Sequence, residues 1–170
     1  MMPTDPLPPE LHRPLSVDRV TASGLEAVVE ASDSERAALA RRLGIPDVLA
    51  LTCRFRLTPS QGGVVMAEGV LRGRLVRVCV VSLDAFEADV EERFRVRFVP
   101  AGTESDDLDP ESDDEIGYSG SVIDLGEAAA EQLALGLDPY PRKPDADLPE
   151  AARAQDESPF AALARLRRDS

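Results

Sequence analysis

Four carboxylates between residues 124 and 138 recur at the spacing of one helix face. They are Asp124, Glu127, Glu131 and Asp138. Their steps of three, four and seven residues suit a divalent-metal or acid–base site, a protein-docking face, or a solvated face that keeps a packing helix soluble. Metal sites in helical bundles add histidine at Glu-x-x-His spacing, and the one histidine of this chain is His12. We therefore favour a solvated face for these carboxylates and keep a protein-docking face as the alternative.

The segment that follows this row is punctuated by prolines. Residues 138–144 read DPYPRKP, and prolines end a helix and force an extended path. Tyr140 lies between two of them, so it either packs back on the core or anchors a partner. The candidate protein contacts are Asp124, Glu127, Glu131 and Tyr140.

Arginines form a second pattern, at strand spacing. In residues 86–99, apolar side chains alternate with charged ones, which predicts a strand with one wet face. Arg93, Arg95 and Arg97 lie about 7 Å apart on that face. Further arginines on neighbouring expected strands are Arg54, Arg56, Arg72, Arg74 and Arg77.

Such a face could hold RNA phosphates, although sheet-based RNA readers interleave aromatic side chains and here the phenylalanines alternate to the other side. The alternative is a charge-balanced wet face, in which Glu87, Asp89 and Glu91 offset the arginines. The candidate RNA contacts are Arg72, Arg74, Arg93, Arg95 and Arg97.

The residue set argues against catalysis. A hydrolase needs a nucleophile with a placed base, and a structural zinc site needs four nitrogen or sulfur ligands. There is one histidine, and Cys53 and Cys79 lie in separate apolar runs, where we expect buried, reduced thiols. No glycine-rich phosphate loop is present. We therefore expect no enzyme, no catalytic residue, no cofactor and no metal.

The charge of the chain is concentrated in one region. Net charge is −13 over 170 residues, and residues 104–150 hold 15 acids and 2 bases, which leaves 17 acids and 17 bases elsewhere. That region should repel nucleic acid and suit a basic protein. No run of about 18 apolar residues and no signal peptide is present, so we expect no membrane span and a cytoplasmic location.

These residues must be positioned by a small set of elements. We expect strands at 14–20, 25–31, 48–57, 64–81 and 86–99, and helices at 33–43 and 124–138. Ser32 and Glu35 form a capping-box pattern before the first helix, and Gly44 suits its end. A sheet that precedes its main helix favours an α+β fold with an antiparallel sheet of about five strands.

The domain organisation follows from composition. Residues 1–13 should be a flexible N-terminus, residues 14–144 a single α+β domain, and residues 101–120 an acidic disordered loop within it. Residues 145–170 should be a linker and a short C-terminal helix, which Ser158 would cap and Phe160 would help to pack.

Several segments in order resemble one known family. They are RVCVVSLDAF (77–86), IDLGE (123–127), EQLAL (131–135), DPYPR (138–142) and SPFAAL (158–163). Over residues 14–167 they resemble the YceD family, the large ribosomal RNA subunit accumulation proteins, and in particular its alphaproteobacterial members. The motif residues are Cys79, Asp124, Leu125, Glu131, Pro139, Pro141, Pro159 and Phe160.

The resemblance implies a non-catalytic ribosome biogenesis factor that supports 23S ribosomal RNA accumulation and large-subunit assembly. The implied partners are ribosomal RNA or a pre-50S particle, with a basic ribosomal protein or assembly factor as a further possibility. The alternative is a small cytosolic protein-binding adaptor with no RNA contact. Many members carry Cys-x-x-Cys where this chain has Cys79 and Ser82, so a metal bound there in relatives is not expected here.

Overall fold

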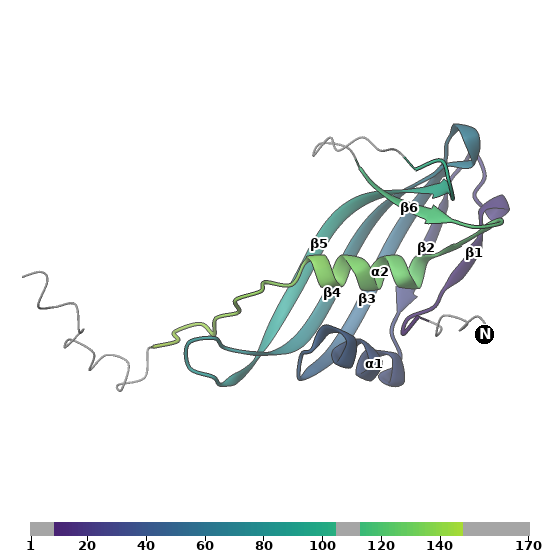
Figure 1. Cartoon of the computed structure of the whole chain (residues 1–170). Coiled ribbons are helices and arrows are strands. Elements are labelled where there is room, and N and C mark those ends of the chain that lie inside the picture. The colour runs from purple at the N-terminus through teal and green to yellow at the C-terminus, as the bar shows by residue number, and fades with distance from the viewer. Residues whose placement is uncertain (1–8, 105–112, 148–170) are drawn as a thin grey trace, which may run out of the picture.

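The computed structural model describes residues 9–104 and 113–147 and shows an α+β fold built on one large, curved sheet (Figure 1). The sheet has the strand order β2-β3-β4-β5-β6, and a separate pair joins β1 to β7. The strands are β1 (Pro14–Ser16), β2 (Leu25–Glu30), β3 (Asp47–Pro59), β4 (Val65–Val78), β5 (Ala85–Pro100), β6 (Asp114–Tyr118) and β7 (Val122–Asp124). The helices are α1 (Asp33–Leu43) and α2 (Leu125–Leu135).

The sheet is mixed, so the expectation of a fully antiparallel sheet was wrong at its last strand. β6 pairs parallel to β5, from Val96 opposite Asp114 to Pro100 opposite Tyr118. β5 ends at Pro100 and β6 begins at Asp114, and a parallel pair needs a connection of about this length. The acids around residues 114–118 predict a disordered loop, and the structure has strand β6 there instead. Tyr118 stabilises this strand despite the acidic composition, because its side chain is buried and its hydroxyl donates to the carbonyl of Gly63 at 2.6 Å.

Long hairpins make up the centre of the sheet. Cys53 lies opposite Leu71, and Val70 lies opposite Arg93. From Leu51 to Leu57 in β3, after the register shift between Val48 and Ala50, and along β4, odd-numbered residues face the core and alternate with outward polar ones. Both cysteines are buried free thiols, which confirms the expectation for Cys53 and Cys79.

Helix α2 lies across the inner face of the sheet (Figure 1). Its stripe of Leu125, Ala129 and Leu133, which are spaced by four residues, is buried. The helix ends at Leu135 rather than at residue 138, because Gly136 terminates it. Gly126 permits a close approach of α2 to the N-terminal segment, since a Cβ there would lie 2.5 Å from the carbonyl oxygen of Leu11. Among the described helices, none is long and apolar enough to cross a membrane.

The N-terminal segment differs from its expectation. Residues 9–13 were expected to be flexible, yet Leu11 is fully buried and packs in the core. β1 ends at Ser16 and continues as a 3₁₀ turn (Val17–Arg19), so the strand predicted over 14–20 is shorter. The predicted C-terminal helix, with Pro159 and Phe160, lies outside the described residues.

Candidate functional site

The five candidate RNA-contact arginines lie on one face of the sheet, the face opposite α2, which we call the outer face. Cross-strand register places them in β4 and β5 with alternating partners. The pairs are Met66 with Arg97, Glu68 with Arg95, Val70 with Arg93, Arg72 with Glu91 and Arg74 with Asp89. The prediction that alternation gathers these arginines on one surface agrees with this register.

Each of these arginines has a carboxylate nearby. Arg97 donates to Glu115 at 2.7 Å and Arg72 to Glu91 at 3.0 Å. The other three have longer separations: Arg74 to Glu87 3.8 Å, Arg93 to Glu91 3.8 Å, and Arg95 to Glu68 3.7 Å. The outer face is therefore charge-balanced, which was the alternative raised from the sequence.

Two further arginines on this face lack such partners. Arg54 and Arg56 are exposed on β3, and no ion pair to either is found among the described residues. In register, Arg54 lies between Val28 of β2 and Val70 of β4. Arg77 was expected on this surface and is not there. It faces the inner side opposite Phe86, and its guanidinium donates to the carbonyl of Asp138 at 2.7 Å.

Two shallow grooves cross the outer face and share residues 68–70. One runs toward β2 and is lined in part by Val28 and Arg54, and the other runs toward β6 and is lined in part by Arg93 and Asp113. Gly69 belongs to both grooves, and its missing side chain leaves room for the Phe94 ring on the inner side of the sheet. The surface thus combines guanidinium groups with small apolar patches.

The acidic row on α2 does not form an open docking face. The Asp124 carboxylate caps α2, accepting from the amides of Gly126 at 2.9 Å and Glu127 at 3.2 Å. It also accepts the Arg13 amide at 2.8 Å and contacts the His12 ring. Asp124 is therefore occupied within the chain, and the sequence held no signal for its N-terminal partners.

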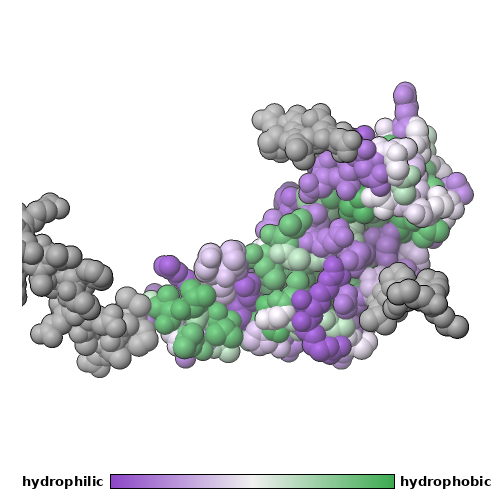
Figure 2. Space-filling model, viewed as in Figure 1, coloured by the Kyte–Doolittle hydropathy of each residue, from purple (hydrophilic) through white to green (hydrophobic). Residues whose placement is uncertain are grey.

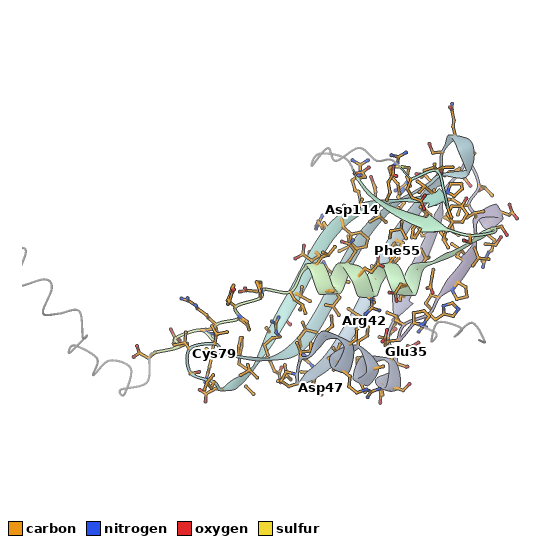
Figure 3. All side chains as sticks on the ribbon, in the orientation of Figure 1. Glu35, Arg42, Asp47, Phe55, Cys79 and Asp114 are labelled. Atoms are coloured by element: carbon orange, nitrogen blue, oxygen red, sulfur yellow. The ribbon has the colours of Figure 1, made fainter. Side chains whose placement is uncertain are left out.

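Glu127 is likewise held inside the fold. Its carboxylate accepts two bonds from Arg42, at 2.8 and 3.0 Å, which joins α2 to α1 (Figure 3). This pairing, with a further bond from Arg42 to Glu10, raises the pKa of Arg42. Burial, and then the neighbouring Glu127 charge, raise the pKa of Glu131. Intramolecular contacts thus explain Asp124 and Glu127 better than either solvation or docking does.

Cys79 begins the turn between β4 and β5, at one end of the molecule (Figure 3). Its buried Sγ accepts the amides of Val81 at 3.4 Å and Ser82 at 3.5 Å. Hydrogen bonds to the sulfur lower the Cys79 pKa to about 6. The Ser82 side chain contributes most, and the amides of Lys143, Ser82 and Val81 add to the effect. Burial raises the Cys53 pKa to about 12. Within residues 9–104 and 113–147, no group of three or more His, Cys, Asp or Glu is placed to hold a metal.

Tyr140 lies beside this turn and is 71% exposed, so it does not pack back on the core. Its amide donates to the Asp138 side chain at 2.8 Å. The neighbouring Pro141 carbonyl accepts the Val80 amide at 2.9 Å, which fixes the segment against the β4–β5 turn. Of the candidate protein contacts, Tyr140 is the most accessible.

Comparison with known proteins gives one match. A family model described as large ribosomal RNA subunit accumulation protein YceD matches residues 67–167. No curated protein and no solved structure matches this chain. The matched residues include all five predicted RNA-contact arginines, the Cys79 turn and α2. More than half of the chain is covered, and the chain therefore belongs to the YceD family of large ribosomal RNA subunit accumulation proteins.

Proposed function

We propose that this protein is a non-catalytic ribosome biogenesis factor that supports 23S ribosomal RNA accumulation by contacting RNA in the cytosol. Family membership supports the role in accumulation of large-subunit RNA. The contact mode rests on one observation, the gathering of arginines from β3, β4 and β5 on the outer face. A non-catalytic role is supported by a residue set that pairs no nucleophile with a base.

The arginines differ in their availability for phosphate. The Arg93 side chain is 77% exposed and lies 3.8 Å from its carboxylate partner. Exposed ion pairs of this kind contribute about 0–1 kcal/mol, so exchange of Glu91 for a phosphate is easy. The Arg97 pair is shorter and less exposed, at 2.7 Å with side chains 36% and 16% accessible. Arg54, Arg56 and Arg93 are therefore the strongest candidates.

The test compares two triple variants on 23S ribosomal RNA fragments across a salt series. Arg54→Gln with Arg56→Gln and Arg93→Gln removes the candidate contacts. Arg19→Gln with Arg41→Gln and Arg142→Gln removes the same charge from other exposed positions. Loss of three phosphate contacts should flatten the slope of log affinity against log salt by roughly 2. Equal slopes for wild type and both variants would count against RNA contact by this face.

A protein-binding adaptor with no RNA contact is the second candidate, and the charge balance of the outer face favours it. Affinity capture from cytosol with and without nuclease separates the two. Partners that survive nuclease and do not depend on Arg54 or Arg93 support the adaptor. Partners that nuclease releases support RNA contact.

A further inference from the structure

Apolar side chains gather at the end of the molecule formed by the β4–β5 turn and residues 136–147, as Figure 2 shows. Leu83 is 77% exposed, Tyr140 71% and Val80 45%. The hydrogen bond from the Val80 amide to Pro141 holds the two segments together. Single exposed apolar residues are common, but a group of them on a fixed surface indicates a binding site. We call Val80, Leu83 and Tyr140 the apolar end.

Leu83 has an unusual backbone conformation for its residue type. Its φ is 61°, in the left-handed region that glycine and asparagine adopt most easily. The turn fixes this conformation, because the Leu83 amide donates to the Cys79 carbonyl at 2.9 Å. Since the Leu83 side chain is largely exposed, nothing in the described fold explains leucine here. A strained backbone that carries an exposed apolar group points to a contact beyond the described residues.

The chain itself supplies a candidate for that contact. The described part ends at Asp147, four residues after Lys143, whose side chain lies 3.7 Å from Asp84 of the turn. Residues 158–167, outside the described residues, place Phe160, Leu163 and Leu166 at a spacing of three in the sequence. This pattern predicts a short amphipathic helix with one apolar stripe.

The intervening chain is long enough for this segment to return. Residues 148–157 can span roughly 33–36 Å when extended. A tether of this length gives an effective concentration in the millimolar range, so a small apolar contact is sufficient. The family match at residues 67–167 also includes both the turn and the C-terminal segment, so the two belong to one matched unit.

We propose that residues 158–167 dock on the apolar end of the same molecule, with Leu83 and Tyr140 as the receiving side chains. The segment would thereby cover the one face of the Cys79 turn that carries exposed leucine and tyrosine. This proposal is independent of RNA contact by the outer face, which lies on β2–β5.

Hydrogen exchange of the full chain tests the proposal. Amides 160–167 should exchange at least tenfold more slowly than in an isolated peptide of residues 156–170. Leu83→Gly keeps the backbone conformation and removes the side chain, so these amides should then exchange at the peptide rate. Phe160→Ala should have the same effect. Val28→Ala, a change at an apolar residue 62% exposed on the outer face, should leave the protection intact.

Three outcomes would overturn the proposal. One is exchange of amides 160–167 at the peptide rate in the wild-type chain. Another is protection that Leu83→Gly leaves unchanged while β4 and β5 keep their own protection. The third is protection that disappears on dilution together with a dimer in mass measurements, because a second copy would then be the occupant.

Discussion

Arg13 and Glu35 are joined by a two-pronged ion pair, with Nη1–Oε1 at 2.6 Å and Nη2–Oε2 at 2.9 Å. Glu35 also accepts the Ser32 amide at 2.8 Å as part of the capping box of α1. Arg13 also donates to the carbonyl of Glu30 at 2.8 Å. One carboxylate therefore fixes both the start of α1 and the N-terminal segment.

Glu35→Gln should lower the free energy of unfolding by about 1–2 kcal/mol, since it weakens a charge-assisted pair and the capping box together. Urea unfolding at pH 7 measures this. Asp33→Asn is the matched control, because its side chain is 98% exposed and it pairs only at the surface with Arg36. Equal destabilisation by the two substitutions would contradict the special role of Glu35.

The ion pair between Arg13 and Glu35 also predicts that the free energy of unfolding depends on pH in the acid range. The hydrogen bond from Arg13, the largest cause, lowers the Glu35 pKa from 4.5 to about 2. A carboxylate with a lowered pKa stabilises the fold above its unfolded pKa, and the stabilisation is lost as pH falls from about 4.5 to about 2. The stability difference between wild type and Glu35→Gln should therefore shrink across that interval. A difference that stays constant from pH 7 to pH 2 would exclude this linkage.

Arg42 and Glu127 should be energetically coupled. Their side chains are 32% and 30% exposed, so solvent screens the pair, and a coupling energy of about 0.5–1 kcal/mol is expected. A double-mutant cycle with Arg42→Gln and Glu127→Gln measures it. A parallel cycle on Arg74 and Glu87, exposed and 3.8 Å apart, is the control and should give a smaller value.

Packing of α2 depends on its apolar stripe rather than on its acids. Leu133 is fully buried, so Leu133→Ala should cost about 2–5 kcal/mol. Leu135, on the same helix and 71% exposed, is the matched control, and Leu135→Ala should cost less than about 0.5 kcal/mol. Thermal and urea unfolding of both variants check this. Similar losses would mean that α2 packs differently from the arrangement described here.

A substitution at Phe94 should partly restore the stability that is lost when Gly69 is replaced by a larger residue. A Cβ at Gly69 would lie 2.1 Å from the Phe94 ring, which itself packs edge-on against Phe55 at 5.7 Å between centroids. Gly69→Ala should therefore cost about 1–3 kcal/mol by overpacking. Adding Phe94→Leu should recover part of that loss, because the smaller side chain can move aside. Additive losses in the double variant would argue against this contact.

The sequence predicted what local pattern encodes. The Ser32–Glu35 capping box and the alternation of β5 each follow from spacing within a few residues, and the structure has both. The grouping of Arg93 with Arg72 follows from the same alternation once the hairpin register is known. These features need no information about distant contacts.

The remaining features depend on partners far away in the chain. The acidic composition of β6 predicts a loop rather than a strand. The hydrogen bond that holds Tyr118 is made to Gly63, which lies 55 residues earlier in the chain. The ion-pair and hydrogen-bond partners of Asp124 and Glu127 could not be predicted from local spacing, because Arg13 and Arg42 come from the N-terminal third of the chain. Arg77 was misplaced for a simpler reason, since its odd position in β4 points to the core side.

The pairing of β1 with β7 has a consequence for synthesis. Arg13 and Asp124 are 111 residues apart, and Leu15 faces Ile123 across the same small sheet. A nascent chain cannot close this contact until β7 has left the ribosomal exit tunnel, so β1 is translated before the other described strands and is among the last to be secured. Closing so large a loop is slow compared with hairpin formation. Until then the apolar underside of β3 and β4 lacks its helix and needs protection from aggregation during translation.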